Sequence, residues 1–182
     1  MTSDVLAALT TLAGSPPAPA RPVPQQTLET VFGMPLPADY VRYVRTVPPG
    51  VYRDTLAVDQ PDGDGSTAEL EAALEFRRGQ LRDDDAPEQL VPWAALGRDY
   101  LVCWIADGDA PDDWQVAVYE PNPFTGGTVH PFAGGCVDFV LAFAAGTTGL
   151  AVLDYAYRHD PGRLFHAFSD RRGAAQLRWA LA

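Results

Sequence analysis

Lysine is absent from this chain of 182 residues, cysteine and histidine are scarce, and no long apolar run occurs. All 13 basic residues are therefore arginines, and the 24 acidic residues give a formal net charge of −11. The only two cysteines, Cys103 and Cys136, do not make a disulfide framework, so we expect a reducing, cytoplasmic location. No apolar run approaches the roughly 20 residues of a membrane span. The first residues lack a basic region before an apolar one, so we expect no signal peptide.

The short motifs of common catalytic and metal sites are missing as well. The three histidines, His130, His159 and His166, lack the close spacing of zinc ligands. No Gly-x-Ser-x-Gly, Gly-x-Gly-x-x-Gly or Walker sequence occurs, so nucleophilic hydrolysis and phosphate binding have no support. Cys103 lies in an apolar segment, where a thiolate is disfavoured. We therefore predict a protein without a metal or cofactor.

One acidic segment resembles a calcium-binding loop. Residues 62–66 alternate aspartate and serine with glycine, as oxygen ligands alternate in an EF-hand. An EF-hand beginning at residue 62 needs glycine at its sixth position and glutamate at its twelfth, where this chain has Thr67 and Ala73. Ser66 and Glu69 instead fit a capping box. The run is therefore predicted to begin a helix rather than to bind calcium.

Hydrophobic patterning predicts an α+β fold with a central, mostly antiparallel sheet of about five or six strands flanked by helices. Residues 100–106 are apolar on both alternating faces, which predicts a strand near the centre of the sheet. Residues 114–120 alternate more cleanly and are expected to be half exposed. The intervals between strands are short and rich in glycine and proline, which favours antiparallel neighbours. The remaining expected strands are 51–59, one beginning near 92, and 128–132. The expected helices are 5–13, 25–32, 37–47, 67–81, 136–145 and 173–181.

The chain is predicted to form one domain with two additions. Residues 1–24 are expected to be a helix and a proline-rich spacer, residues 25–146 the α+β domain, and residues 147–182 an extension packed on it. Charge is uneven along the chain. Residues 1–153 hold 21 acids and 8 arginines, a balance of −13, whereas residues 154–182 hold 3 acids and 5 arginines, a balance of +2.

The acidic balance bears on the class of partner. Such a surface repels nucleic acid and anionic membranes, and it steers a basic protein toward itself. Solubility alone is the other explanation of the charge. Exposed aromatic side chains beside carboxylates make good binding anchors, although core packing is the alternative for each tryptophan. The residues expected to contact a partner are Asp83, Asp84, Asp85, Trp93, Asp107, Asp109, Asp112, Asp113 and Trp114.

Several segments resemble one known family. The run Leu36-Pro-Ala-Asp-Tyr40 is similar to a Leu-Pro-x-x-Tyr helix start, and it is followed by Val91-Pro-Trp93, the strand with Trp104, and a closing helix at 137–143. In these features, over about residues 27–146, the chain resembles the SUKH superfamily, which includes fungal cell-wall-synthesis regulators and many bacterial toxin-immunity proteins. The resemblance implies an α+β fold used as a non-catalytic protein-binding module. In bacteria such proteins typically neutralise a cognate toxin by docking on it.

Our hypothesis is a cytoplasmic bacterial immunity protein, not an enzyme, whose acidic surface docks a basic toxin domain. One alternative is a regulatory scaffold without a toxin partner. The other is a small enzyme with a carboxylate site, using Asp107, Asp109 or His130. Such an enzyme requires a carboxylate that is desolvated enough to shift its pKa. The sequence leaves the oligomeric state open.

Overall fold

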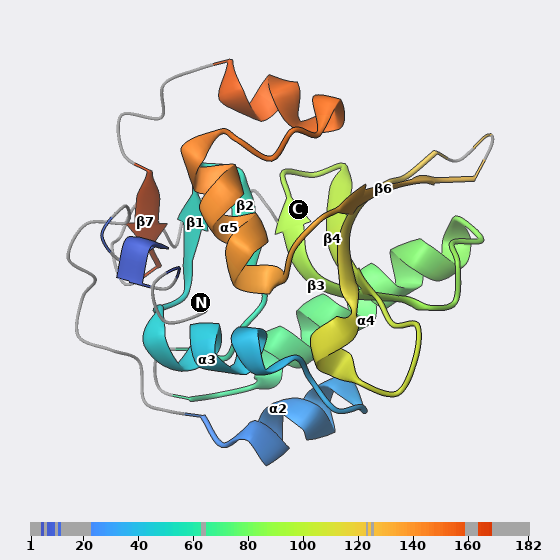
Figure 1. Ribbon diagram of the computed structural model, residues 1–182. Helices are drawn as coiled ribbons and strands as arrows, with labels where there is room; N and C mark the ends of the chain where they lie inside the picture. Colours follow the sequence, from blue (N-terminus) through green and yellow to red (C-terminus); the bar gives the residue numbers. More distant parts are fainter. Residues whose placement is uncertain are drawn as a thin grey trace.

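The computed structural model describes residues 5, 7–9, 11, 23–62, 65–122, 124, 126–158 and 164–168. Within these residues an antiparallel sheet of seven strands is flanked by helices, which confirms the predicted α+β class (Figure 1). Helical residues are found at 5, 7–9 and 11, inside the helix predicted at 5–13. The helix predicted at 173–181 lies outside the described residues.

The strands follow one another across the sheet in an order close to their order along the chain. From one edge to the other they are β6 (Thr128–Phe132), β5 (Gln115–Glu120), β4 (Tyr100–Ile105), β3 (Leu90–Leu96), β2 (Leu56–Val58), β1 (Gly50–Tyr52) and β7 (Phe165–Ala167). The helices are α2 (Gln25–Phe32), α3 (Ala38–Thr46), α4 (Ala68–Asp83) and α5 (Cys136–Ala145), with the 3₁₀ helices η1 (Pro111–Asp113) and η2 (Ala151–Tyr157).

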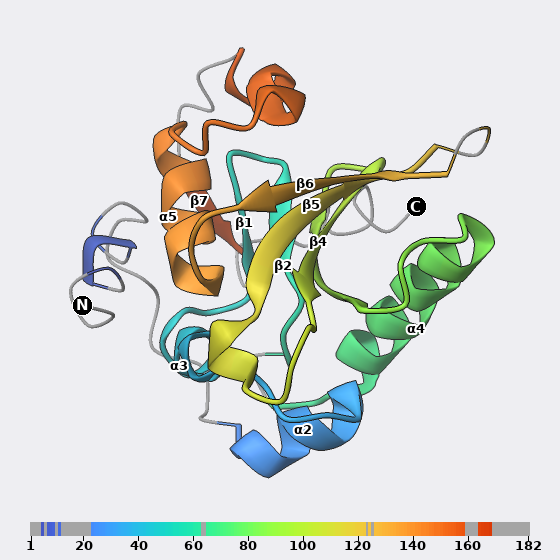
Figure 2. The same cartoon turned by 45° about the vertical axis from the view of Figure 1, so that its right-hand side comes forward.

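Strand β4 is buried on both faces, as its double apolar pattern predicts. Val102 and Trp104 point into the main hydrophobic core, while Leu101 and Cys103 belong to a second cluster on the opposite face. Figure 2 shows α3 and α5 on one side of the sheet and α4 on the other. The predicted central strand therefore lies between two helical layers, one place away from the middle strand β3.

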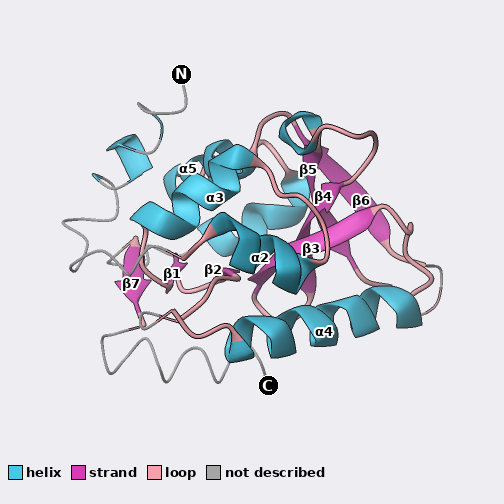
Figure 3. Ribbon diagram, turned by 90° about the horizontal axis from the view of Figure 1, so that it is seen from below, coloured by secondary structure: helices cyan, strands magenta, loops and turns pink. Residues whose placement is uncertain are grey.

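Aromatic rings fill the space between the sheet and helices α2, α3 and α5. Tyr40 of α3 meets the Trp104 ring edge-on at a centroid distance of 5.1 Å. Trp93 stacks on Trp104 at 5.6 Å, and Phe139 of α5 meets Trp93 edge-on at 6.1 Å. Such pairs add about 0.5–1.5 kcal/mol each beyond the burial of their area. This cluster holds α3 beside α5, an arrangement seen from below in Figure 3.

The segment predicted as one strand at 51–59 is instead a hairpin of β1 and β2. Arg53 and Asp54 adopt left-handed backbone angles, with φ of 48° and 57°. The Thr55 N–H donates to the Tyr52 carbonyl oxygen at 3.0 Å and closes the turn. Turns of this kind are usually marked by asparagine or glycine. Arginine followed by aspartate gives no such signal, so the prediction of one strand was wrong.

One further detail differs from the prediction. Helix α4 begins after Thr67, whose hydroxyl donates to the Glu71 carboxylate at 2.8 Å, so the predicted capping box of Ser66 and Glu69 does not start it. The apolar spacing of residues 150–157 fits either a helix or a strand, and the structure has η2 there. Leu153 of η2 and Phe165 of β7 lie in the main core. In the described part of the chain no helix is both long enough and apolar enough to cross a membrane.

Candidate docking surface at the ends of two helices

The loop between β4 and β5 presents carboxylates to solvent, as predicted. Asp107, Asp109 and Asp113 are exposed. Trp114 is half-buried, and its indole Nε1–H donates to the Gly108 carbonyl oxygen at 3.1 Å. This hydrogen bond folds the loop back on itself, so Asp107 and Asp109, which flank the glycine, stand beside the tryptophan.

Asp112 of this loop closes the start of α3. Pro37 precedes the first residue of that helix and provides no side-chain cap. The Ala38 N–H instead donates to Asp112 Oδ1 at 2.6 Å, across 74 positions of the sequence. Carboxylates at this end of a helix satisfy otherwise unpaired N–H groups and complement the helix dipole. The predicted contact residue Asp112 therefore has a structural task as well.

Asp39 likewise satisfies a backbone N–H group at the start of helix α5. The Val137 N–H donates to Asp39 Oδ2 at 3.2 Å, and the Gly135 N–H donates to Asp138 Oδ2 at 3.3 Å. Only glycine allows this approach, because a Cβ at position 135 would lie 2.5 Å from Asp39 Oδ2. Burial raises the pKa of the Asp39 carboxyl above its usual 3.8, although backbone N–H donors, led by Val137, oppose the shift.

These contacts gather carboxylates from three elements around one hollow. Its walls include Arg42, Trp104 and Trp114 beside the ends of α3, α5 and η1. We call this region the acidic corner. Its carboxylates are Asp39, Asp107, Asp109, Asp112, Asp113 and Asp138. Asp39, Asp112 and Asp138 line the hollow with Arg42, and Asp107, Asp109 and Asp113 are exposed on the same β4–β5 segment as Asp112, so the corner is an anionic surface.

Asp39 and Asp138 were missed by the sequence reasoning. Each stands in the first turn of its helix, a position where acids are common and indicate only a helix start. Nothing local indicates that two helix starts 98 positions apart converge. Two exposed phenylalanines of the described residues were not predicted either. Phe76 on α4 is 55 % exposed, and Phe124 in the β5–β6 loop is 92 % exposed.

The other predicted acidic segment, Asp83, Asp84 and Asp85, lies elsewhere. Burial, and then the nearby Asp84 carboxylate, raise the pKa of the Tyr119 hydroxyl. Tyr119 pairs with Leu101 at the start of β4, whereas the acidic corner follows the other end of that strand. We call these three residues the acidic turn. The structure therefore does not join the two predicted contact segments in one surface.

Trp93 requires a correction. Its side chain is 0 % exposed and lies between Tyr40, Trp104 and Phe139. The proline before it suggested the exposed start of a strand, but β3 is buried along its whole length. Trp93 is therefore a core residue and not a surface anchor.

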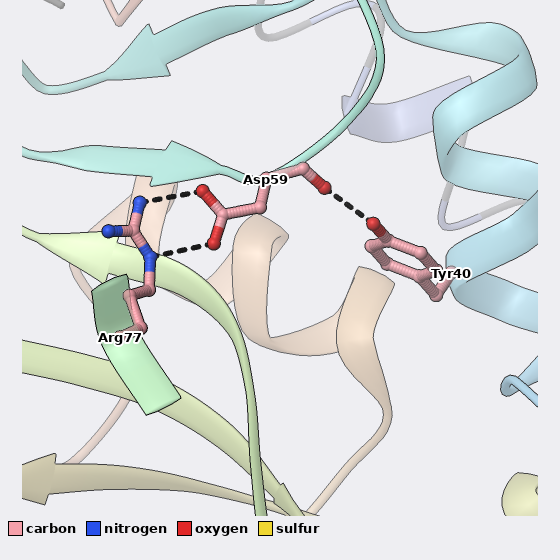
Figure 4. Close-up of polar contacts among 3 residues, drawn as sticks. All are labelled: Tyr40, Asp59 and Arg77. Atoms are coloured by element: carbon pink, nitrogen blue, oxygen red, sulfur yellow. Dashed lines mark hydrogen bonds and ion pairs between the residues drawn. The ribbon is translucent and has the colours of Figure 1, made fainter. Parts of the chain in front are cut away.

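A buried ion pair was also missed. Asp59 follows β2, and both of its carboxylate oxygens accept from Arg77 of α4, at 2.7 Å from Nε and 2.6 Å from Nη2 (Figure 4). The Asp59 carbonyl oxygen accepts from the Tyr40 hydroxyl, and its N–H donates to the Trp93 carbonyl oxygen at 2.9 Å. Asp59 thus ties α3, α4 and β3 together. A usable signal existed, because Arg77 lies on the same helical stripe as Leu70, Leu74 and Leu81.

The residues of the carboxylate-enzyme alternative are not brought together. Asp107 and Asp109 are exposed at the acidic corner. His130 Nε2 lies 3.0 Å from Glu120 Oε2 on the β5–β6 hairpin, toward the opposite end of β5. Burial raises the pKa of the Cys103 thiol, as its apolar strand predicts. Across the described residues, no three His, Cys, Asp or Glu side chains are arranged to hold a metal ion, and Asp64 lies outside them.

Comparison with protein-family models, with curated proteins and with solved structures finds no match to this chain. The SUKH resemblance therefore rests on the sequence motifs. Leu36, Tyr40, Trp93 and Trp104, which carry those motifs, all lie in the main hydrophobic core.

Proposed function

We propose that this chain is a non-catalytic protein-binding module whose acidic corner docks a basic partner protein. The observation that carries the proposal is the convergence of Asp39, Asp112 and Asp138, from α3, η1 and α5, around a hollow lined by Trp114. The β4–β5 segment that provides Asp112 adds the exposed Asp107, Asp109 and Asp113. Their carboxylates accept from backbone N–H groups or face solvent, so their charge is not cancelled by buried cations. A basic surface would find there both electrostatic attraction and an apolar contact.

The acidic corner also suits recognition because its framework is fixed. Asp112 and Asp39 are held by N–H groups of two helices that pack on the aromatic core. Preorganised groups lose little conformational entropy when a partner docks. The acidic turn is a local chain reversal with Asp85 in a left-handed conformation, at φ of 51°. We therefore assign docking to the corner and give the turn a minor role.

In the finer form of the proposal, the partner is a basic toxin domain and the protein is a cytoplasmic bacterial immunity protein. The sequence resemblance to the SUKH superfamily supports this form. A regulatory scaffold without a toxin would use the same surface. Gene order separates the two, because a neighbouring gene for a large secreted protein with a variable C-terminal domain favours immunity.

The carboxylate-enzyme alternative has weaker support. It needs a desolvated acid among Asp107 and Asp109. Both side chains are exposed. The partner reading, in contrast, requires exposed carboxylates.

A differential capture experiment tests the assignment. The wild-type chain, the Asp107→Asn/Asp109→Asn variant and the Asp83→Asn/Asp85→Asn variant are each immobilised and exposed to native cell extract at low ionic strength. Both variants remove two exposed charges, and asparagine is well tolerated at the left-handed position 85. Asp112 is left intact because it caps α3.

We expect a basic protein to be retained by the wild type and by the turn variant and to be lost from the corner variant. Equal retention of every captured protein by all three columns would contradict docking at the acidic corner. Loss from both variants would show that net charge, and not this surface, determines binding.

A further inference from the structure

A second hollow lies between the residues that follow β2, the first half of α4, and Phe168 after β7. Much of its wall is apolar, with Val58, Leu70 and Ala73 among the residues that line it. Its volume is about 50 Å³. A cavity of about 150 Å³ holds a benzene molecule, so this hollow admits only a small chemical group. We call it the Gln60 hollow, after the polar side chain that distinguishes it.

The Gln60 side chain lacks a hydrogen-bond acceptor in this hollow. It is 8 % exposed, and its amide Nε2 has no hydrogen-bond partner within the described part of the chain. A buried N–H group without an acceptor costs free energy comparable to a lost hydrogen bond. The amide therefore indicates a ligand that brings an acceptor oxygen.

A second donor lines the same hollow. Arg77 is 3 % exposed, and its Nε and Nη2 donate to the two carboxylate oxygens of Asp59. Its third nitrogen, Nη1, forms no hydrogen bond with the described residues, and Figure 4 shows one guanidinium nitrogen on the side away from Asp59. Because Asp59 balances the charge of Arg77, the hollow offers N–H donors without a net positive charge.

Two donor groups beside an apolar wall favour a carbonyl oxygen as the acceptor. A carbonyl oxygen has two lone pairs and no hydrogen, so it accepts from both donors and leaves nothing of its own unpaired. A water molecule has two hydrogens to place and needs two to four polar partners. A carboxylate also accepts, but the exposed carboxylate of Glu69, which belongs to the lining, repels it. Glu69 instead favours a ligand with an N–H donor.

We propose that the Gln60 hollow binds an uncharged carboxamide group. The carbonyl oxygen of the ligand accepts from Gln60 Nε2 and Arg77 Nη1, its NH₂ group donates to Glu69, and its carbon atoms contact Leu70 and Ala73. The Gln60 hollow shares no lining residue with the hollow of the acidic corner. The proposal therefore does not depend on the function assigned to that corner.

Nuclear magnetic resonance of the full chain tests the proposal with propionamide as the probe. The side-chain NH₂ signal of Gln60 is identified by its loss in Gln60→Leu. We expect propionamide to shift this signal and the backbone amide signals of Leu70 and Ala73, with an affinity of about millimolar or weaker because the ligand has few atoms. The amide signals of Asp107 and Asp113 should not move.

Two variants and a second probe test the contacts. Gln60→Leu should weaken the binding of propionamide about tenfold, as the loss of one hydrogen bond does. Its urea midpoint should not fall, because the Gln60 amide Nε2 has no partner in the described part of the chain. Propionate, which has the same carbon skeleton, should bind about tenfold more weakly than propionamide. Glu69→Gln should strengthen the binding of propionate, whereas Glu88→Gln, the same change at another exposed site, should not.

An unmoved Gln60 signal in the presence of propionamide would overturn the proposal, and so would equal binding of propionamide by Gln60→Leu. Equal binding of propionate by the wild type would contradict an uncharged ligand. N-acetylglutamine N-methylamide distinguishes two sources of the carboxamide. Binding of this longer probe supports a glutamine side chain of another protein, and its exclusion beside bound propionamide supports a free small molecule.

Discussion

Asp59 and Asp112 have the same side chain but lie in opposite environments. Asp59 is 8 % exposed, and both of its oxygens are bound by Arg77. Asp112 is exposed, and one of its oxygens accepts from the first N–H of α3. The first charge is cancelled inside the protein, whereas the second is oriented but remains open to solvent. The comparison separates acids that hold the fold together from acids that are available to a partner.

The largest expected effect is at the buried pair. Arg77→Met leaves the Asp59 carboxylate buried without its cation, and we expect a loss of about 3–5 kcal/mol in the free energy of unfolding. The double variant Asp59→Leu/Arg77→Met removes both charges and should lose much less. Urea denaturation of the two variants measures the difference.

Arg82→Met provides the matched control on the same helix. Arg82 pairs with Glu75 at 3.1 Å, but both side chains are largely exposed. Its loss should therefore cost about 0–1 kcal/mol. If Arg82→Met were as costly as Arg77→Met, burial would not be what distinguishes the two pairs.

The environment of Asp39 is intermediate between those of Asp59 and Asp112. Substitutions at Asp39 are therefore expected to lower the free energy of unfolding by less than the loss of Arg77 does. Asp39→Ala removes the acceptor for the Val137 N–H and should cost about 0.5–2 kcal/mol, as the loss of a helix cap does. Asp39→Asn keeps an acceptor oxygen and should cost less. Comparing the urea midpoints of these variants measures the contribution of the cap.

The pH dependence of Asp39 has a definite sign. Burial raises the pKa of this carboxyl in the folded protein above 3.8, so the folded state binds more protons than the unfolded state between the two pKa values. Stability from this group is therefore greatest below pH 3.8 and declines as the pH rises through the folded pKa. Asparagine does not titrate. The stability of Asp39→Asn relative to the wild type should thus rise with pH across this window, and a constant difference would contradict the assignment.

The sequence predicts much of the framework because its signals are local. The two apolar faces of residues 100–105 indicate β4, and Pro37 with the stripe of Tyr40 and Val44 indicates α3. The β1–β2 turn could not be recognised, because Arg53 and Asp54 adopt a conformation that other residues favour. Strand β7 is only three residues long, which is too short to show the alternation of residue types that predicts a strand.

The candidate surface was predicted only in part, for a different reason. The acids of the β4–β5 loop can be read directly from the sequence. Asp39 and Asp138 join them only because aromatic packing brings the starts of α3 and α5 together. Trp93 and Trp114 were both predicted to contact a partner, yet one is fully buried and the other half-buried. Tertiary packing determines whether a tryptophan in such a position is buried or exposed.

The most direct test of docking at the acidic corner is the association rate of the captured partner as a function of ionic strength. Stopped-flow mixing compares the wild type with Asp107→Asn/Asp109→Asn and with Asp83→Asn/Asp85→Asn. Exposed charges at an interface act chiefly on association, so we predict roughly several-fold slower binding and a weaker salt dependence for the corner variant alone. Equal slowing by both variants, or an unchanged rate for the corner variant, would contradict the account.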